Sequence, residues 1–222
     1  MSEFVFREID PRNDEDMRKY FVLAEKLSKF LKNGASFDEN QMRWARIRMG
    51  AIEYVDLSDW INRQLQPIEE NAHEFVFVCQ CDNKFVGYIN FCDYHMVKSG
   101  KIIEDDTGAI HEIFVHQDYR KNHTIASNLL MLAVNKLLSK GKTKAVCSVQ
   151  DDNPNKFLHF VIADGNIIDK EECTREDGSK TVDNTLLIDL INLQKMSGME
   201  IAKKAAKLKR KQINQNKDNL II

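Results

Sequence analysis

The sequence of 222 residues lacks any apolar run long enough to cross a bilayer, and its first residues, MSEFVFREID, lack the pattern of a secretory signal. It also lacks an excess of one charge. The 32 Lys and Arg stand against 34 Asp and Glu, which leaves a net charge of −2. A balance this close to neutral excludes a protein that binds polyanions over its whole surface. We therefore expect a cytoplasmic protein with no membrane partner.

The cysteines lack the arrangement of a metal site or a disulfide framework. There are five of them, an odd number, and they fall in predicted strands with no histidine at metal-ligand spacing. Cys79 and Cys81 are two residues apart, so both thiols lie on one face of a strand, a poor geometry for pairing with each other. We expect buried, reduced thiols and no bound metal, with a single reactive cysteine as the alternative.

Hydrophobic periodicity predicts strands and helices over most of the chain, and no internal repeat is evident. Strands are expected at 4–9, 74–81, 84–92, 109–116, 143–149, 166–173 and 181–190. Helices are expected at 14–32, after a capping box Ser36-x-x-Glu39, at 57–67, at 123–139 and at 154–163. Turn residues at Asp82-Asn83 and Asp177-Gly178 predict hairpins, and Gly141 fits the end of the helix at 123–139.

The most informative segment is 111–130, HEIFVHQDYRKNHTIASNLL. It predicts a buried strand, then a turn rich in basic residues, then an amphipathic helix. This order brings cations and a helix N-terminus together at the edge of a strand. Backbone N–H groups at 124–127 would be free of intrahelical partners, and the helix dipole favours negative charge there, so the segment could bind a phosphorylated cofactor.

This segment resembles the acceptor loop of the GNAT superfamily of acyl-CoA-dependent N-acyltransferases. That loop reads Gln/Arg-x-x-Gly-x-Gly/Ala, after a strand that ends in Val and a Tyr-Arg pair. Here residues 121–126 read Lys-Asn-His-Thr-Ile-Ala, and they follow Val115 and Tyr119-Arg120. The order of the expected elements also matches the superfamily over about residues 3–190.

Two loop positions depart from the pattern. Lys121 replaces the usual Gln or Arg, and Thr124 replaces the middle glycine. Glycine lets the backbone approach a phosphate closely and adopt positive φ, and a β-branched residue resists both. We therefore expect either a weakened pyrophosphate site or one in which the Thr124 hydroxyl reaches a phosphate.

The resemblance implies a mixed α/β fold of the α+β type. Its central sheet would be mixed, mostly antiparallel and twisted, flanked by helices, with a basic C-terminal helix added. We expect an acyltransferase domain at 1–190 and a basic helical extension at 191–222.

The resemblance also implies acetyl-CoA as co-substrate. Its pantetheine arm would pair with the strand at 113–115, and its pyrophosphate would lie on the loop and the start of the helix. The residues implied are Ile113, Phe114, Val115, Arg120, Lys121, Asn122, His123, Thr124, Ile125, Ala126, Ser127 and Asn153. For Asn153, a simple helix cap is the preferred alternative.

N-acyl transfer needs a base, because an alkyl amine with a pKa near ~10 is mostly protonated at neutral pH. Glu112 is the candidate, since amine-acetylating members often carry an acidic residue there and desolvation would raise the pKa of its carboxyl group. Strand alternation sends His111 to the opposite face. A structural ion pair of Glu112 is the alternative. In the family a tyrosine often protonates the departing thiolate, and Phe160 stands nearest that position. Phenylalanine cannot donate a proton, so His159, water or the substrate would supply it, or the thiolate would leave unaided.

The sequence predicts an N-acetyltransferase that moves an acetyl group from acetyl-CoA to a primary amine of a polyamine-like or aminoglycoside-like molecule or of a protein. The alternative is a non-catalytic binding or regulatory module with the same fold and a weakened CoA site. Residues 36–70 and 93–107 would border the acceptor. Their acidic residues could favour a cation, although such charge runs are usually solvated surface.

The basic segment 195–217 has three readings. It is a solvated tail, a docked helix that helps the protein form a homodimer, or the one part of the chain that could contact nucleic acid.

Overall fold

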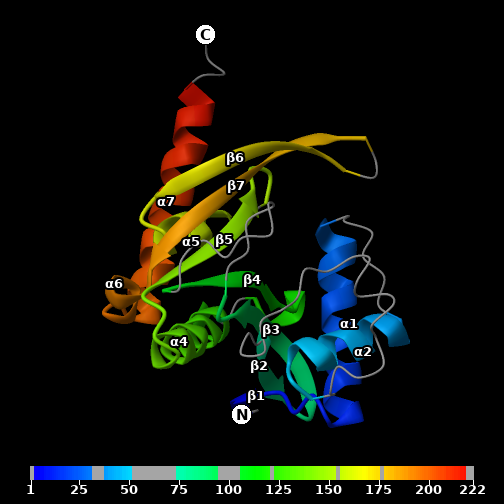
Figure 1. Cartoon of the computed structure of the whole chain (residues 1–222). Helices are drawn as coiled ribbons and strands as arrows, with labels where there is room; N and C mark the ends of the chain where they lie inside the picture. The colour runs from blue at the N-terminus through cyan, green and yellow to red at the C-terminus, as the bar shows by residue number, and fades with distance from the viewer. Residues whose placement is uncertain are drawn as a thin grey trace.

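The computed structural model describes residues 3–31, 38–51, 74–94, 106–120, 123–153, 156–175 and 178–218. Within these ranges seven strands form one sheet in the order β1-β2-β3-β4-β5-β7-β6 (Figure 1). The strands are β1 (Phe4–Glu8), β2 (Glu74–Cys81), β3 (Lys84–Cys92), β4 (Thr107–Val115), β5 (Lys144–Gln150), β6 (Ile167–Thr174) and β7 (Lys180–Asp189). All neighbouring strands in this order pair antiparallel except β4 and β5, which are parallel. The predicted mixed, mostly antiparallel sheet is confirmed.

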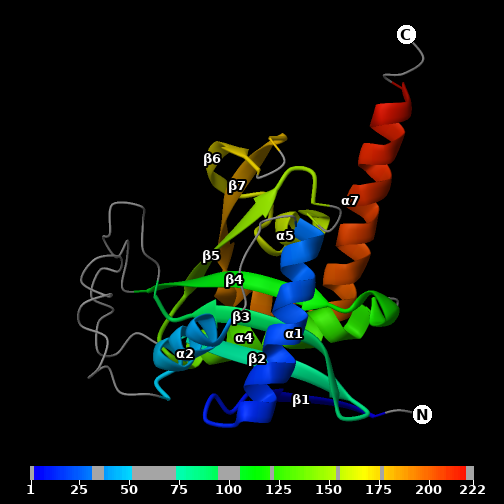
Figure 2. The ribbon, with the colours of Figure 1, turned by 90° about the vertical axis from the view of Figure 1, so that its right-hand side faces the viewer.

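Helices cover both faces of this sheet. They are α1 (Asp14–Leu31), α2 (Glu39–Arg48), the 3-10 turn η2 (Gln117–Tyr119), α4 (His123–Ser139), α5 (Lys156–Ile162), α6 (Leu190–Gln194) and α7 (Gly198–Asp218). Figure 2 shows α1 and α2 in front of β2, β3 and β4, with α4 behind them. Two hydrophobic clusters correspond to these faces, one under α1 around Met17 and Tyr88, the other under α4 around Leu129 and Phe91.

The hairpin turns form where the sequence predicts them. Asp82 and Asn83 have φ of 46° and 61° between β2 and β3, as a two-residue turn with left-handed residues requires. Gly178 at the tip of the β6–β7 hairpin has φ of 78°. The predicted capping box at Ser36 is wrong, because α2 begins at Glu39 and the side chain of Asp38 accepts the N–H of Gln41. The predicted helix at 57–67 and most of the loop at 93–107 lie outside the described residues.

The chain after β7 returns to the core before it leaves the domain. Leu190, Leu193 and Ile201 are fully buried in the cluster under α4. Helix α7 packs against α4, which lies on β2–β4, and against α5, which lies on β5 and β7. Further along, Leu208 is exposed, and so are the α7 lysines whose side chains are described, Lys203, Lys204, Lys207 and Lys209. The boundary at 190/191 stays a prediction, and the start of the extension shares the core of the domain.

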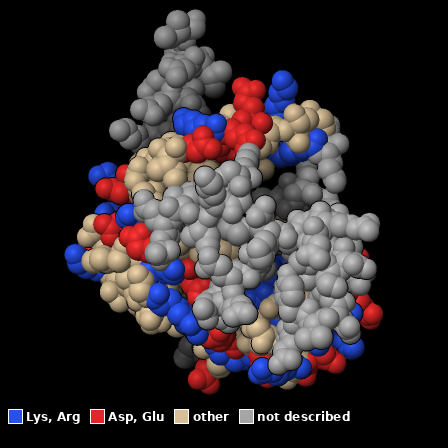
Figure 3. Space-filling view, in the orientation of Figure 1, with Lys and Arg blue, Asp and Glu red and all other residues tan. Residues whose placement is uncertain are grey.

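The described surface carries side chains of both charges, as the near-neutral composition predicts. On the face shown in Figure 3, basic and acidic side chains of the described residues are interspersed. The described helices include none that is long and apolar enough to span a membrane.

Candidate active site

The site is organised by the place where β4 and β5 separate. They pair only at Thr107–Lys144, Gly108–Ala145 and Ala109–Val146. Beyond these pairs β5 stays with β7 and β4 stays with β3, and Figures 1 and 2 show the two strands diverging. The edge of β4 from Ile110 to Val115 therefore has no strand partner on that side among the described residues. A polar chain can pair with this edge.

We call the space beside this edge of β4, where β4 and β5 diverge, the slot, and its closed end is where the two strands pair. The backbone of β4 presents alternate residues to the slot. The N–H of His116 donates to the carbonyl of Val86 on β3, at 2.8 Å. Because alternate residues of an antiparallel strand face each neighbour, Phe114 also faces β3, and Ile113 and Val115 face the slot. The three residues predicted to pair with the cofactor therefore differ in the direction of their backbone groups. Ile113 and Val115 can pair with a pantetheine arm through their backbone, whereas the backbone of Phe114 is directed to Tyr88.

Arg120 lies at the far end of the same strand. Its Nε donates to the carbonyl of Val115 at 2.9 Å, and its guanidinium carbon lies 5.5 Å from the centre of the Phe114 ring. These contacts hold the positive charge of Arg120 between the end of β4 and the start of α4. Lys121 and Asn122, the next two predicted residues, lie outside the described residues.

The N-terminus of α4 is held close to the sheet. A Cβ at Gly87 would lie 3.0 Å from the carbonyl oxygen of Phe114 and 3.2 Å from Cγ2 of Ile125, so glycine permits this approach. The helix begins at His123, and the backbone N–H groups of its first turn, 123–125, have no intrahelical acceptor. Thr124 is exposed, whereas the side chain of Ile125 is fully buried, so Ile125 has only its backbone to offer a ligand.

Ser127 does not fit the role predicted for it. It lies in the second turn of α4, where N–H groups bond to carbonyls one turn earlier. Its hydroxyl donates to the carbonyl of Thr124 at 3.1 Å, and only 7% of the residue is exposed. Gly198 of α7 covers it, since a Cβ there would lie 2.5 Å from the Ser127 Oγ. We leave Ser127 out of the proposed cofactor contacts. Ala126, beside it, is half-buried.

Glu112 lies on β4 beside the slot, and its side chain points under α1. The hydroxyl of Tyr88 donates to Glu112 Oε2 at 2.7 Å. Burial raises the pKa of the Glu112 carboxyl group, and the Tyr88 hydrogen bond and the charge of His111 oppose that rise. Burial also raises the pKa of the Tyr88 hydroxyl, so Tyr88 stays a donor to the carboxylate. This is a partly buried carboxylate, and the neutral Tyr88 hydroxyl holds it in place.

The predicted opposite placement of His111 is wrong. The pairing of β3 and β4 shifts between Asn90 and Phe91, because Asn90 faces Glu112 while Phe91 faces Ile110. His111 is the extra residue of this bulge, and bulges break the alternation of side chains. Its Nε2 lies 3.2 Å from Sγ of Cys92, which shares a face of β3 with Tyr88 and Asn90. His111 and Glu112 therefore both lie on the face under α1.

The cysteines are free of disulfides, and four of the five are buried. Burial raises the pKa of the Cys79, Cys92 and Cys147 thiols to about 12. Thiols with such a pKa are poor nucleophiles near neutral pH, which argues against the alternative of a reactive cysteine at these three positions. Within the described ranges no group of three or more His, Cys, Asp or Glu side chains could hold a metal ion.

The remaining predicted residues lie around β5 and α5. The carbonyl of Asn153 accepts the N–H of Lys156, the first residue of α5, so Asn153 lies shortly before this helix. A contact of Asn153 with the cofactor stays a prediction. Phe160 is half-buried and packs on the core under α4. Asp106, expected beside the acceptor, instead accepts the Thr143 hydroxyl at 2.7 Å at the closed end of the slot.

The comparisons with known proteins agree with this geometry. A family model described as "Acetyltransferase (GNAT) family" matches residues 40–157, more than half of the chain. The fold, the separated strands and this match define an acyltransferase-type domain. The chain belongs to the GNAT acetyltransferase family.

Solved structures show the same fold at low identity. The putative acetyltransferase yncA from Salmonella typhimurium, with its cofactor acetyl-CoA, is 14% identical with a TM-score of 0.56, over 85% of this chain and 95% of that one. An N-acetyltransferase from Staphylococcus aureus Mu50 is 15% identical with a TM-score of 0.57, over 85% and 99%. The NatC complex bound to Gag peptide and CoA is 14% identical with a TM-score of 0.50, over 84% and 98%. A search of curated proteins found no match.

Proposed function

We propose that this protein is a cytoplasmic N-acetyltransferase that moves the acetyl group of acetyl-CoA to a primary amine of a small molecule or a protein. The observation that carries the proposal is the position of Glu112. Its carboxylate is partly buried, is held by Tyr88, and lies on the strand whose outer edge borders the slot. A base in that position can take a proton from an amine that approaches a thioester held along Ile113 and Val115.

The residues present fit acetyl-CoA. Ile113 offers a backbone donor and acceptor, and Val115 offers its N–H, for a pantetheine arm in the manner of an added strand; the Val115 carbonyl also accepts from Arg120. The first turn of α4 with Thr124, together with Arg120 and Lys121, offers N–H groups and positive charge for a pyrophosphate. His123 and Asn122 complete this loop in the sequence. When bound, acetyl-CoA supplies the thioester whose carbonyl carbon the amine attacks.

The chemistry then follows from the residues of the chain. Glu112 accepts a proton from the ammonium group, and the nitrogen lone pair forms a bond to the carbonyl carbon. As the tetrahedral intermediate collapses, the C–S bond breaks and the thiolate leaves. A thiol with a pKa near ~8.5 is an acceptable leaving group, so Phe160 at the place of the family's tyrosine is compatible with turnover.

The cofactor site is tested by calorimetry with CoA. We expect micromolar binding that weakens about tenfold or more for Lys121→Ala, because loss of one charge-assisted contact to a phosphate costs about 1.5–3 kcal/mol. Lys203→Ala, at an exposed position of α7, is the matched control and should bind CoA as the wild type does. No binding up to millimolar CoA would favour the alternative of a non-catalytic module, which the replacement of the loop glycine by Thr124 supports.

Tyr88→Phe tests the arrangement of the base. The Tyr88 hydroxyl lowers the pKa of Glu112, so its removal should raise that pKa further. The acidic limb of kcat/KM should then move to higher pH, with activity at alkaline pH largely retained. A profile of acetyl transfer against pH measures this. An unmoved limb in a folded Tyr88→Phe protein would show that another group is the base.

A further inference from the structure

The sheet face under α1 and α2 carries polar side chains in an otherwise apolar layer. Val76, Val78 and Phe114 on this face are buried in the hydrophobic cluster around Met17. Among them lie polar groups from five elements, namely Tyr20, Arg48, Glu74, Tyr88, Asn90 and Glu112. We call these six residues the inner polar cluster. Sequence analysis identified only Glu112 among them.

Three members of the inner polar cluster come from neighbouring strands. Asn90 on β3 is directly opposite Glu112 on β4. On the other side Asn90 is opposite Val76 of β2, and Glu74 lies two residues before Val76 on the same face. The three side chains therefore form a diagonal row that ends at the base beside the slot.

Two oxygens of this row accept no hydrogen bond from the described residues. They are Oε2 of Glu74 and Oδ1 of Asn90, and both are buried. The Glu74 side chain is only 10% exposed, and its other oxygen lies 2.7 Å from Nε of Arg48. The amide nitrogen of Asn90 donates to the Tyr20 hydroxyl at 3.3 Å. A buried acceptor without a donor costs about 1–3 kcal/mol, so two in one row call for an explanation.

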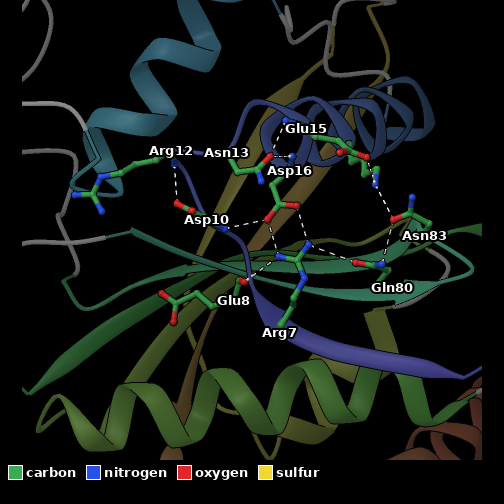
Figure 4. A network of polar contacts seen from close by, with 10 residues as sticks. Arg7, Glu8, Asp10, Arg12, Asn13, Glu15, Asp16, Gln80 and Asn83 are labelled. Atoms are coloured by element: carbon green, nitrogen blue, oxygen red, sulfur yellow. Dashed lines mark hydrogen bonds and ion pairs between the residues drawn. The ribbon is translucent and has the colours of Figure 1, made fainter.

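Asp16 is a buried carboxylate with a structural role, and its hydrogen bonds serve as a comparison for those of Glu74 (Figure 4). Its Oδ1 accepts from Arg7 at 2.7 Å. Its Oδ2 accepts from Arg7 at 2.6 Å and from the backbone N–H of Asp10 at 3.1 Å. Both oxygens of Asp16 thus have donors. Glu74 has a similar arginine partner in Arg48, but no described residue donates to its second oxygen.

Two carboxylates lie along the row. Arg48 lies beside Glu74, and the charge of His111 also acts on Glu112. Burial raises the pKa of the Tyr20 hydroxyl, and the charges of Glu112 and Glu74 raise it further. Both carboxylates therefore lie close enough to Tyr20 to act on its hydroxyl. Three acceptors, one on each residue of the row, match the three N–H donors of a primary ammonium group.

We propose that Glu74 and Asn90 bind the acceptor amine in its ammonium form beside Glu112. This inference rests on the proposed function. Glu74 Oε2 and Asn90 Oδ1 accept two N–H groups, and Glu112 takes the third proton as the nitrogen attacks the thioester carbonyl. Of the two protons that remain on nitrogen, one stays in the amide, and the other passes to the departing thiolate directly or through water. The acceptor class is then a primary alkylammonium, and the substrate itself supplies the proton that Phe160 cannot.

The experiment is a thermal-shift titration of the full chain with n-butylammonium chloride at constant ionic strength. A ligand that binds only the folded protein raises the unfolding temperature with its concentration. The variants are Glu74→Gln, Asn90→Leu and Asn90→Asp. Asp16→Asn is the matched control, because it also removes a buried carboxylate charge that lies beside an arginine, and Asp16 lies outside the row. 1-Butanol is the uncharged probe of the same length, and CoA is titrated separately.

We expect n-butylammonium to stabilise the wild type and Asp16→Asn, and 1-butanol to stabilise neither. The apparent Kd should weaken tenfold or more in Glu74→Gln and Asn90→Leu and tighten in Asn90→Asp, which adds a negative charge. Equal shifts in all proteins, or no shift in the wild type, would overturn the inference. Its failure is separable from that of the proposed function, because CoA binding would persist if only the ammonium site is wrong.

Discussion

Glu112→Gln is expected to reduce kcat for acetyl transfer by about 10²–10⁴, the usual contribution of a positioned general base. The substitution keeps the shape of the side chain and an oxygen for the Tyr88 hydroxyl, and it removes the ability to accept a proton. The KM for acetyl-CoA should change little, because the proposed pantetheine contacts would use the backbone of Ile113 and Val115. Release of the CoA thiol with a panel of primary alkyl amines, followed over pH, measures both quantities.

The pH dependence gives a second measurement that needs no acceptor. Burial raises the pKa of Glu112 in the folded protein, so over the interval between the unfolded and folded pKa values the folded state binds more protons. Stability should therefore fall as pH rises through that interval, and Glu112→Gln should remove this part of the slope. Urea unfolding at several pH values tests it. If Glu112→Gln keeps wild-type turnover and only the slope changes, Glu112 is a structural partner of Tyr88.

Gly108→Ala is expected to be among the most destabilising single-methyl additions in the sheet, at about 2–3 kcal/mol. Gly108 is the middle of the three residues that join β4 to β5. A Cβ there would lie 2.7 Å from the carbonyl oxygen of Cys92 and 2.8 Å from Cδ2 of Leu137, so β3 or α4 would have to move. The free energy of unfolding from urea titration measures the loss.

Gly178→Ala is the control for Gly108→Ala. Gly178 has φ of 78° at a hairpin tip, and a Cβ there meets nothing within 4 Å. Its substitution should cost about 1 kcal/mol, from backbone conformation alone. If the Gly108→Ala protein is no less stable than Gly178→Ala, then β3 or α4 can shift to accept the added methyl group at little cost. The spacing of β4 and β5 at the closed end of the slot would then be variable.

Local patterns predicted most of the fold. Apolar runs bounded by turn residues placed β2 and β3 at their observed bounds, and the helical spacing of apolar residues placed α4. These signals are local. The cap at Asp38 was missed because Ser36 and Glu39 fit the capping-box pattern equally well, and the difference lies in which side chain reaches an N–H.

The site was predicted in part, because a linear pattern cannot show which strands become neighbours. The bulge at His111 depends on an offset between β3 and β4, and no residue type marks it. Glu74 and Asn90 become meaningful only when β2, β3 and β4 are side by side. One signal was available, since Asn90 is a polar amide inside the apolar strand FVGYINFC. Ser127 was predicted to contact the cofactor because its N–H was counted among those at the start of the helix. Gly198, which covers it, lies some seventy residues later in the sequence, and no local pattern shows that contact.

Helix α7 connects the two sides of the slot, and this has a thermodynamic consequence. It touches α4, which rests on the half-sheet β1–β4, and α5, which rests on β5 and β7. Among the described residues β4 and β5 pair at three positions, so α7 is a second connection between the two half-sheets. Linkage is reciprocal: if a docked α7 favours the slot width that a ligand needs, that ligand must strengthen the docking of α7 by the same factor. Whatever binds the exposed lysines of α7 would then act on affinity at the slot without touching it.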